Sequence, residues 1–250
     1  MSRMESSEVK EERTVFFQHI PKCAGTTLNI EIFKKRFQPN ELRLLYDYNM
    51  PEIIDLLKGM SVLEQMKIKC LSGHYYFGIH TYYTARPSFH MTILRNPIER
   101  VISHYYQVRR HKPHRLYQIV TENDLSLKEY VNNRLTPELN NGQVRVLAGL
   151  SINPPFGECE RDILELAKKN LKDSFGIVGL TERFDDFLLL VNAKLGWEIP
   201  SYKNLNIGEN RKKADEIDKE TLDVIEKHNQ LDIELYEYAQ DLFLKQFAEI

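Results

Sequence analysis

The residues best suited to chemistry lie in positions 14–28, where an apolar run leads into a turn with a lysine, a glycine and two threonines. A strand that ends at a helix N-terminus leaves backbone N–H groups unpaired, and the helix dipole there favours an anion. Gly25 allows close approach of the backbone, the two following threonines add hydroxyl donors, and Lys22 adds a positive charge. This turn predicts a phosphate-binding site.

The turn differs from the P-loop of nucleoside-triphosphate enzymes, in which the lysine directly follows the second glycine. Here Lys22 precedes Gly25. Taken alone, the segment has a simpler interpretation: an ordinary strand-turn-helix corner with a solvated lysine.

A second segment, positions 89–110, also reads as a buried strand that runs into a helix. Arg95 follows the strand, and Pro97 stands near the first helical position. Ligands of parallel α/β sheets bind at the carboxyl ends of the strands, so Arg95 is a candidate phosphate ligand. Ser103, two turns into the helix, could lie near the same groove. The alternative for Arg95 is a salt bridge to a nearby glutamate.

Together, the segments HIPKCAGTT and LRNPIERVISHYYQVRR resemble the sulfotransferase superfamily, and in particular the glycan O-sulfotransferases of the heparan-sulfate 2-O type. The shorter runs 72–74 (SGH), 141–145 (NGQVR) and 179–184 (GLTERF) add to the resemblance. The implied fold class is α/β: a P-loop-like three-layer domain whose central, mainly parallel sheet is flanked by helices. The implied donor is 3′-phosphoadenosine 5′-phosphosulfate (PAPS), and no metal is expected.

The resemblance also implies how the donor is held. Arg95 and Ser103 would bind its 3′-phosphate, and a late loop at 204–211 would add Arg211 and Lys212. The 5′-phosphosulfate end would be held by the residues Pro21, Lys22, Cys23, Ala24, Gly25, Thr26 and Thr27.

Sulfuryl transfer resembles phosphoryl transfer, because the attacking and leaving oxygens lie roughly in line and catalysis rests on positioning and charge stabilisation. Lys22 is placed to stabilise the negative charge that grows on the leaving oxygen. The attacking hydroxyl needs a base, and the resemblance assigns this role to His74. His80 and Glu31 are competing candidates, whereas His19 is expected to pack at the end of the first strand.

The predicted function is transfer of a sulfuryl group from PAPS to a hydroxyl acceptor, with a carbohydrate as the favoured acceptor. Related enzymes often carry His-Gly-His where this chain has Ser72-Gly73-His74, so an oligosaccharide, a lipid-linked sugar and a small alcohol or phenol stay open as acceptors. Two other functions also stay open: a P-loop kinase or nucleotide hydrolase, and a non-catalytic nucleotide-binding protein.

Composition predicts one domain over 14–250, after a disordered tail at 1–13, in a chain of 250 residues with 42% hydrophobic content. The net charge of −2 argues against a nucleic-acid partner. Three widely spaced cysteines fit a reducing compartment, and no apolar run has the length of a membrane span. A cytoplasmic location is therefore expected, although many animal members of the resembled group are anchored in the Golgi.

Hydrophobic periodicity predicts strands over 15–19, 68–72, 89–94 and 175–179. Long loops are expected over 111–124 and 151–160. Helices are expected over 26–37, 51–58, the segment that ends near 110, 125–132, 161–171, 184–195, 218–227 and 232–247.

Overall fold

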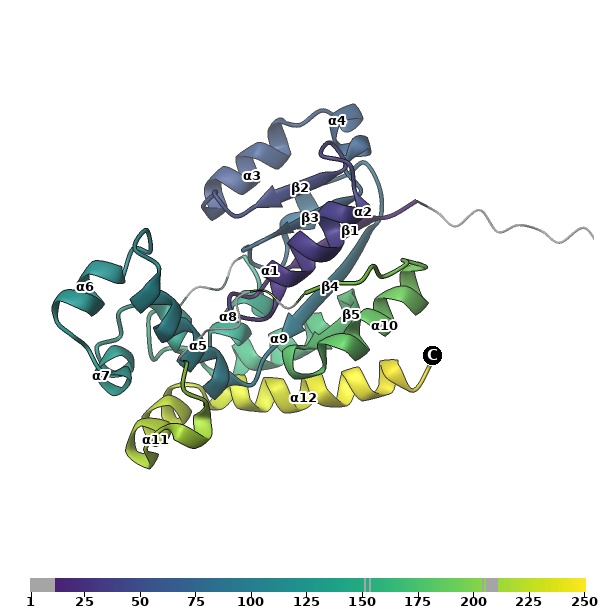
Figure 1. Cartoon of the computed structure of the whole chain (residues 1–250). Helices are drawn as coiled ribbons and strands as arrows, with labels where there is room; N and C mark the ends of the chain where they lie inside the picture. The colour runs from purple at the N-terminus through teal and green to yellow at the C-terminus, as the bar shows by residue number, and fades with distance from the viewer. Residues whose placement is uncertain (1–11, 151, 153, 204, 206–210) are drawn as a thin grey trace, which may run out of the picture.

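The computed structural model describes residues 12–150, 152, 154–203, 205 and 211–250. Its centre is a five-stranded, all-parallel sheet with the strand order β2-β3-β1-β4-β5 (Figure 1). The strands are β1 (Thr14–Gln18), β2 (Leu42–Leu45), β3 (Cys70–Gly73), β4 (Ser88–Leu94) and β5 (Phe175–Leu180). The predicted α/β fold class is confirmed, while most of the predicted tail lies outside the described residues.

The middle strand β1 explains why the sheet is covered on both faces. All five of its residues are buried, as expected of a central parallel strand. Phe17 packs into a core with the helices that follow β1 and β5, whereas its neighbour Phe16 packs on the opposite face with Leu71 and Ile53. Alternate side chains thus hold two helical layers against one sheet.

Helices occupy most of the remaining described chain, and Figure 1 shows α3 and α4 beyond β2, α12 along the β5 side, and α6 and α7 projecting from α5. Their bounds are α1 (Gly25–Thr27), α2 (Lys34–Arg36), α3 (Met50–Gly59), α4 (Val62–Lys67), α5 (Pro97–Arg110), α6 (Tyr117–Glu122), α7 (Leu127–Asn132), α8 (Gly142–Ala148), α9 (Arg161–Ser174), α10 (Phe184–Leu195), α11 (Lys219–His228) and α12 (Gln230–Phe247). A second apolar cluster lies among α5, α6, α7 and α11.

The structure differs from several local predictions, and it also contains two helices, α4 and α8, that were not predicted. The helix predicted over 26–37 contains a π-helical segment, Leu28–Phe33, where the Asn29 side-chain amide donates to the Gly25 carbonyl at 2.7 Å. The loop predicted over 111–124 contains α6, and the loop over 151–160 has no helix or strand among its described residues. The short strand β2 was not predicted.

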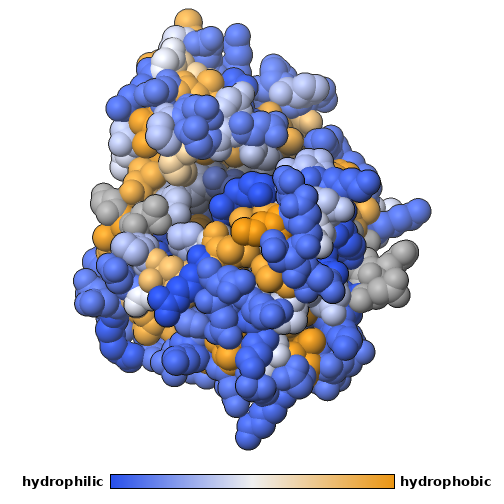
Figure 2. Space-filling view, turned by 90° about the vertical axis from the view of Figure 1, so that its left-hand side faces the viewer, coloured by the Kyte–Doolittle hydropathy of each residue, from blue (hydrophilic) through white to orange (hydrophobic). Residues whose placement is uncertain are grey.

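The order of the strands fixes where a ligand can bind. The connection that leaves β1 leads to β2 on one side of it, whereas the connection from β3 crosses β1 and leads to β4 on the other side. Such a reversal of the strand order opens a crevice at the carboxyl ends of the strands. These ends point to the left in Figure 1, and Figure 2, which looks at that side, shows a hollow near the middle of the surface. Three predicted site segments follow β1, β3 and β4 at this edge.

Candidate active site

The loop after β1 has an unusual backbone. Lys22 and Ala24 both have positive φ angles, 74° and 57°, and α1 begins directly afterwards at Gly25. A Cβ atom on Gly25 would lie 2.2 Å from the ring of His19, so only glycine fits beneath that ring. The predicted packing role of His19 agrees with this contact. The loop is therefore a tight turn that presents Lys22 at the start of a helix.

The turn after β4 meets this loop directly. The guanidinium Nη1 of Arg95 donates to the Lys22 carbonyl at 3.1 Å. Asn96 caps α5 by accepting hydrogen bonds from the backbone N–H groups of Ile98 and Glu99, with Pro97 as the first helical residue. Two segments separated by 73 positions thus converge on one place, as the sequence predicted.

Positive charges accumulate at this meeting point. The pKa of Lys22 is lowered to about 8, first by burial and then by the nearby cations Arg95, Arg110 and Arg211. Burial and Arg211 likewise lower the pKa of Arg95, whose buried Nε has no hydrogen-bond partner among the described residues. A bound anion would relieve this repulsion and satisfy the unpaired donor.

Glu99 partly neutralises the cluster. Its carboxylate lies 3.5 Å from Arg95 Nη2 and 2.7 Å from Arg211 Nη1, and it accepts a hydrogen bond from the Ala214 backbone at 2.9 Å. The salt bridge considered as an alternative for Arg95 therefore exists. One carboxylate is shared between two arginines, which leaves a net positive charge beside Lys22.

The other predicted donor-site residues take different positions. Arg211 joins Arg95 through Glu99, whereas Lys212 is exposed. Ser103 is buried on α5. Thr27 accepts a hydrogen bond from the Leu205 backbone, which brings the late loop to the phosphate loop; most of that loop, 204 and 206–210, lies outside the described residues.

Cys23 lies beneath the loop and does not face a ligand. It is fully buried, its Sγ contacts the Gln143 side-chain oxygen at 3.7 Å, and burial raises its pKa to about 12. A thiol in this environment stays protonated and packs as a small hydrophobe.

His74 follows β3 at the same edge of the sheet. His74 is exposed, and its ring stands 4.6 Å from the His19 ring and 4.7 Å from the Tyr46 ring, measured between centroids. The surrounding protein desolvates the ring and lowers the pKa of His74 to about 4, with Lys22 adding to the shift and Glu138 opposing it. The imidazole is therefore neutral at pH 7 and able to accept a proton.

A buried hydroxyl network stands behind His74. The Tyr46 hydroxyl contacts His19 Nδ1 at 2.9 Å and Ser72 Oγ at 3.0 Å, and Ser72 donates to the Asn29 side chain at 2.6 Å. Ser72 is thus a buried structural hydroxyl. Sequence reasoning missed Tyr46, because it missed β2, the strand that precedes it.

The competing candidates for the base lie elsewhere. His80 packs against His90, with ring centroids 4.5 Å apart, and against Phe77. Glu31 pairs with Lys35 at 2.7 Å on the helix that follows the phosphate loop. Neither is among the described residues that line the pocket next to His74.

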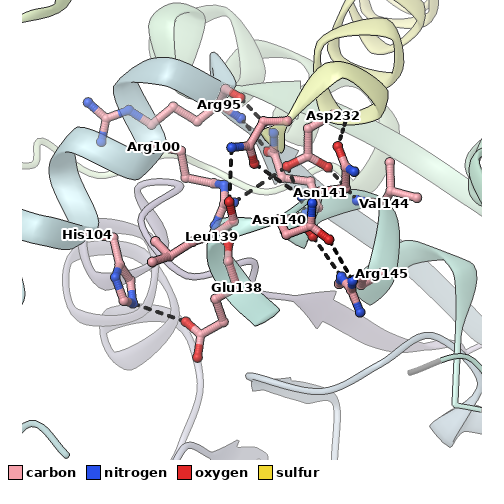
Figure 3. Close-up of polar contacts among 12 residues, drawn as sticks. Arg95, Arg100, His104, Glu138, Leu139, Asn140, Asn141, Val144, Arg145 and Asp232 are labelled. Carbon is pink, nitrogen blue, oxygen red and sulfur yellow. Dashed lines mark hydrogen bonds and ion pairs between the residues drawn. The ribbon is translucent and has the colours of Figure 1, made fainter. Parts of the chain in front are cut away.

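A pocket of about 150 Å³ connects the phosphate loop to His74. Glu138 and the buried Arg100 also line it (Figure 3). The Glu138 carboxylate contacts the buried His104 at 3.1 Å and Arg115 at 3.1 Å, and its backbone carbonyl accepts a hydrogen bond from Arg100 Nη2 at 2.7 Å. The pocket is lined by His19, Ile20, Pro21, His74, Tyr75, Tyr76, Arg100, Glu138, Gly142 and Val146. A larger pocket of about 530 Å³ lies near the amino ends of β2 and β3 and contains none of the predicted site residues.

Heparan-sulfate sulfotransferases are similar to this chain in sequence. Human heparan-sulfate 6-O-sulfotransferase 1 is 30% identical over 193 residues, which cover 66% of this chain and 45% of that protein. Human heparan-sulfate 6-O-sulfotransferase 3 is 34% identical over 190 residues (65% and 39%), and the zebrafish (Danio rerio) enzyme 1-B is 26% identical over 286 residues (96% and 68%). The chain spans about half the length of most of the relatives that it matches.

These relatives correct two predictions. The matched enzymes are of the 6-O type and not of the predicted 2-O type. The predicted cytoplasmic location is contradicted, because the relatives are heparan-sulfate sulfotransferases, the group with Golgi-anchored animal members, and the prediction rested only on composition. Within the described residues, no helix combines the length and the apolar character needed to cross a membrane.

The family comparison agrees with the fold and with the predicted class of enzyme. A parallel sheet carries the phosphate loop after β1, the arginine turn after β4 and the histidine after β3, in the layout that the resemblance implied. Residues 7–239 match the Sulfotransferase family, and the chain therefore belongs to this family.

Proposed function

We propose that this protein transfers a sulfuryl group from PAPS to a hydroxyl of a heparan-sulfate-like glycan. The observation that carries the proposal is the convergence of Lys22, Arg95 and Arg211 at one sheet edge, beside a pocket that contains His74. A donor with phosphates at both ends supplies the anions that this cluster lacks. The names of the relatives support the glycan acceptor.

In this proposal the loop of residues 21–27 binds the 5′-phosphosulfate end of the donor, and Arg95 binds the 3′-phosphate with Ser103 and Arg211 nearby. The backbone N–H groups at the start of α1 point toward the anion. Lys212, being exposed, contributes less. These residues fit the donor because an unpaired arginine Nε and a lysine with a lowered pKa both favour added negative charge.

Catalysis follows from the same geometry. The acceptor hydroxyl, in the pocket, attacks the sulfur as the bond between sulfur and the bridging phosphate oxygen breaks, and His74 takes the proton of the hydroxyl. Lys22 stabilises the negative charge that develops on the bridging oxygen. Glu138, on the same pocket, favours the imidazolium that His74 becomes, because it opposes the lowering of that pKa.

The test is a His74→Ala variant, with His80→Ala as the control. Transfer of radiolabelled sulfate from PAPS to desulfated heparan sulfate should be lost in His74→Ala, while calorimetry should give an unchanged Kd for adenosine 3′,5′-bisphosphate. His80→Ala should keep both. Unchanged turnover in His74→Ala would remove His74 from the role of base.

Two further results would overturn the proposed activity itself. Tight, magnesium-dependent binding of ATP in preference to the bisphosphate would favour a kinase or nucleotide hydrolase. Binding of the bisphosphate without transfer to a panel of glycans and alcohols would favour a non-catalytic nucleotide-binding protein.

A further inference from the structure

The run Asn141–Arg145 has no part in the chemistry proposed above, yet all five of its residues are buried. It forms the start of α8, and this N-terminal part of the helix lies near Arg95 (Figure 3). A buried polar run needs hydrogen-bond partners throughout, so its contacts reveal what it holds in place.

The backbone of this run is fixed to α12. The fully buried Asp232 carboxylate accepts hydrogen bonds from the N–H groups of Gln143 at 3.1 Å and Val144 at 2.8 Å. In return, the Asn141 side chain accepts from the N–H groups of Leu231 and Asp232 at 3.0 and 3.1 Å. The start of α8 therefore has little freedom to shift relative to the rest of the fold.

The Gln143 side chain reaches from this anchored position to the donor site. Its Oε1 accepts from the Arg95 backbone N–H at 3.0 Å, and its Nε2 donates to the Arg95 carbonyl at 2.9 Å. The same Oε1 accepts from Cys23 Sγ at 3.7 Å. One fully buried amide thus contacts both phosphate-binding segments, while Arg95 itself donates to the Lys22 carbonyl.

We infer that Gln143 is a positioning residue that holds the Arg95 turn in register with the Lys22 loop, so that the two segments grip opposite ends of one donor molecule. The inference rests on the proposed function. A glutamine suits this role because only a side-chain amide offers one donor and one acceptor at the spacing of a single residue's N–H and C=O groups. Glutamate would present an oxygen to the Arg95 carbonyl, and leucine would leave both backbone groups without a partner.

The experiment compares Gln143→Leu and Gln143→Glu with a matched control, Gln65→Leu. Gln65 is likewise a buried glutamine, on α4 and away from the site. Among the described residues, its side chain bonds backbone groups of Leu57, Met60, Thr84 and Ala85. Calorimetry at 15 °C measures the affinity of each variant for adenosine 3′,5′-bisphosphate and for adenosine 5′-monophosphate. The melting temperature of each variant is measured as well.

Both Gln143 variants should weaken bisphosphate binding about tenfold or more and 5′-monophosphate binding much less, whereas Gln65→Leu should lower only the melting temperature. In a protein that already carries Arg95→Ala, adding Gln143→Leu should lower the affinity for the bisphosphate by less than about twofold. The effects of substitutions at residues in contact are not additive, so a residue that acts through Arg95 has little effect once Arg95 is removed. Equal losses for both ligands, or additive losses in the double variant, would overturn the inference. So would failure of both Gln143 variants to fold at 15 °C, since Gln143 would then serve the whole fold.

Failure of the proposed function is recognised separately. If the unaltered protein does not bind the bisphosphate, that function is wrong, and amide hydrogen exchange still tests the contact. Exchange at the Arg95 amide should then rise in Gln143→Leu and stay unchanged in Gln65→Leu; an unchanged rate in both would overturn the positioning role.

Discussion

The two sides of the pocket are held in different ways. On the donor side, a direct hydrogen bond joins Arg95 to Lys22, and the Gln143 amide contacts both Arg95 and Cys23 of the Lys22 loop. On the acceptor side, the His74 ring has no hydrogen-bond partner among the described residues and stands beside the rings of His19 and Tyr46. The nucleotide is expected to meet a rigid site, whereas His74, the proposed base, is expected to keep freedom to reorient as an acceptor binds.

Among the substitutions on the donor side, one at Lys22 should have the largest effect on the rate of sulfuryl transfer. Lys22→Ala should lower the rate of sulfuryl transfer about 10²- to 10³-fold, because it removes the charge that faces the leaving oxygen. Steady-state rates at saturating donor measure this effect. Lys34→Ala, which alters an exposed lysine on α2, is the control and should keep the normal rate. An unaffected Lys22→Ala enzyme would mean that another group stabilises the leaving oxygen.

The pH profile tests both sides at once. The pKa of His74 is lowered to about 4 and that of Lys22 to about 8, so His74 is neutral above the first value and Lys22 is charged below the second. The ratio kcat/KM for the donor should rise about tenfold per pH unit below 4, and fall likewise above 8. Lys22→Arg should remove the alkaline fall, and Glu138→Gln should move only the acidic limb, to lower pH. A profile that is flat from pH 3 to 10 would contradict both assignments.

Arg95 distinguishes the two ends of the nucleotide. Arg95→Ala should lower the affinity for adenosine 3′,5′-bisphosphate about 10- to 100-fold, because a charge-assisted contact is lost. The affinity for adenosine 5′-monophosphate should stay within about twofold of its normal value. Calorimetry with both ligands gives the comparison. If the affinities for both ligands fell equally, Arg95 would not bind the 3′-phosphate.

The smallest effect is expected from a substitution at Gly25, which tests the packing between the two sides of the pocket through its effect on stability. Gly25→Ala forces a Cβ atom against the His19 ring, so the free energy of unfolding should fall by about 1–3 kcal/mol. Gly59→Ala is the matched control, because no atom lies within 4 Å of its added Cβ atom, and it should be neutral or slightly stabilising. Urea denaturation measures both. A neutral Gly25→Ala variant would show that the His19 ring can move aside.

The contrast between the two sides also explains what the sequence could predict. The phosphate loop and the Arg95 turn are local strand-turn-helix patterns, and their convergence follows from the parallel sheet. The Gln143 contact joins residues 48 positions apart, and no local pattern signals it. Tyr46 was missed because β2 is only four residues long and its burial does not alternate. Glu138 faces the pocket from a short turn whose sequence gives no sign of its partners, His104 and Arg115.

The central claim is that one bisphosphorylated nucleotide bridges the Lys22 loop and the Arg95 turn. Titration calorimetry of the unaltered protein with adenosine 3′,5′-bisphosphate, adenosine 5′-monophosphate and ATP tests it most directly. We predict that the bisphosphate binds at least about tenfold more tightly than either other ligand, without a need for magnesium. Equal affinity for the bisphosphate and the monophosphate, or a magnesium-dependent preference for ATP, would contradict it.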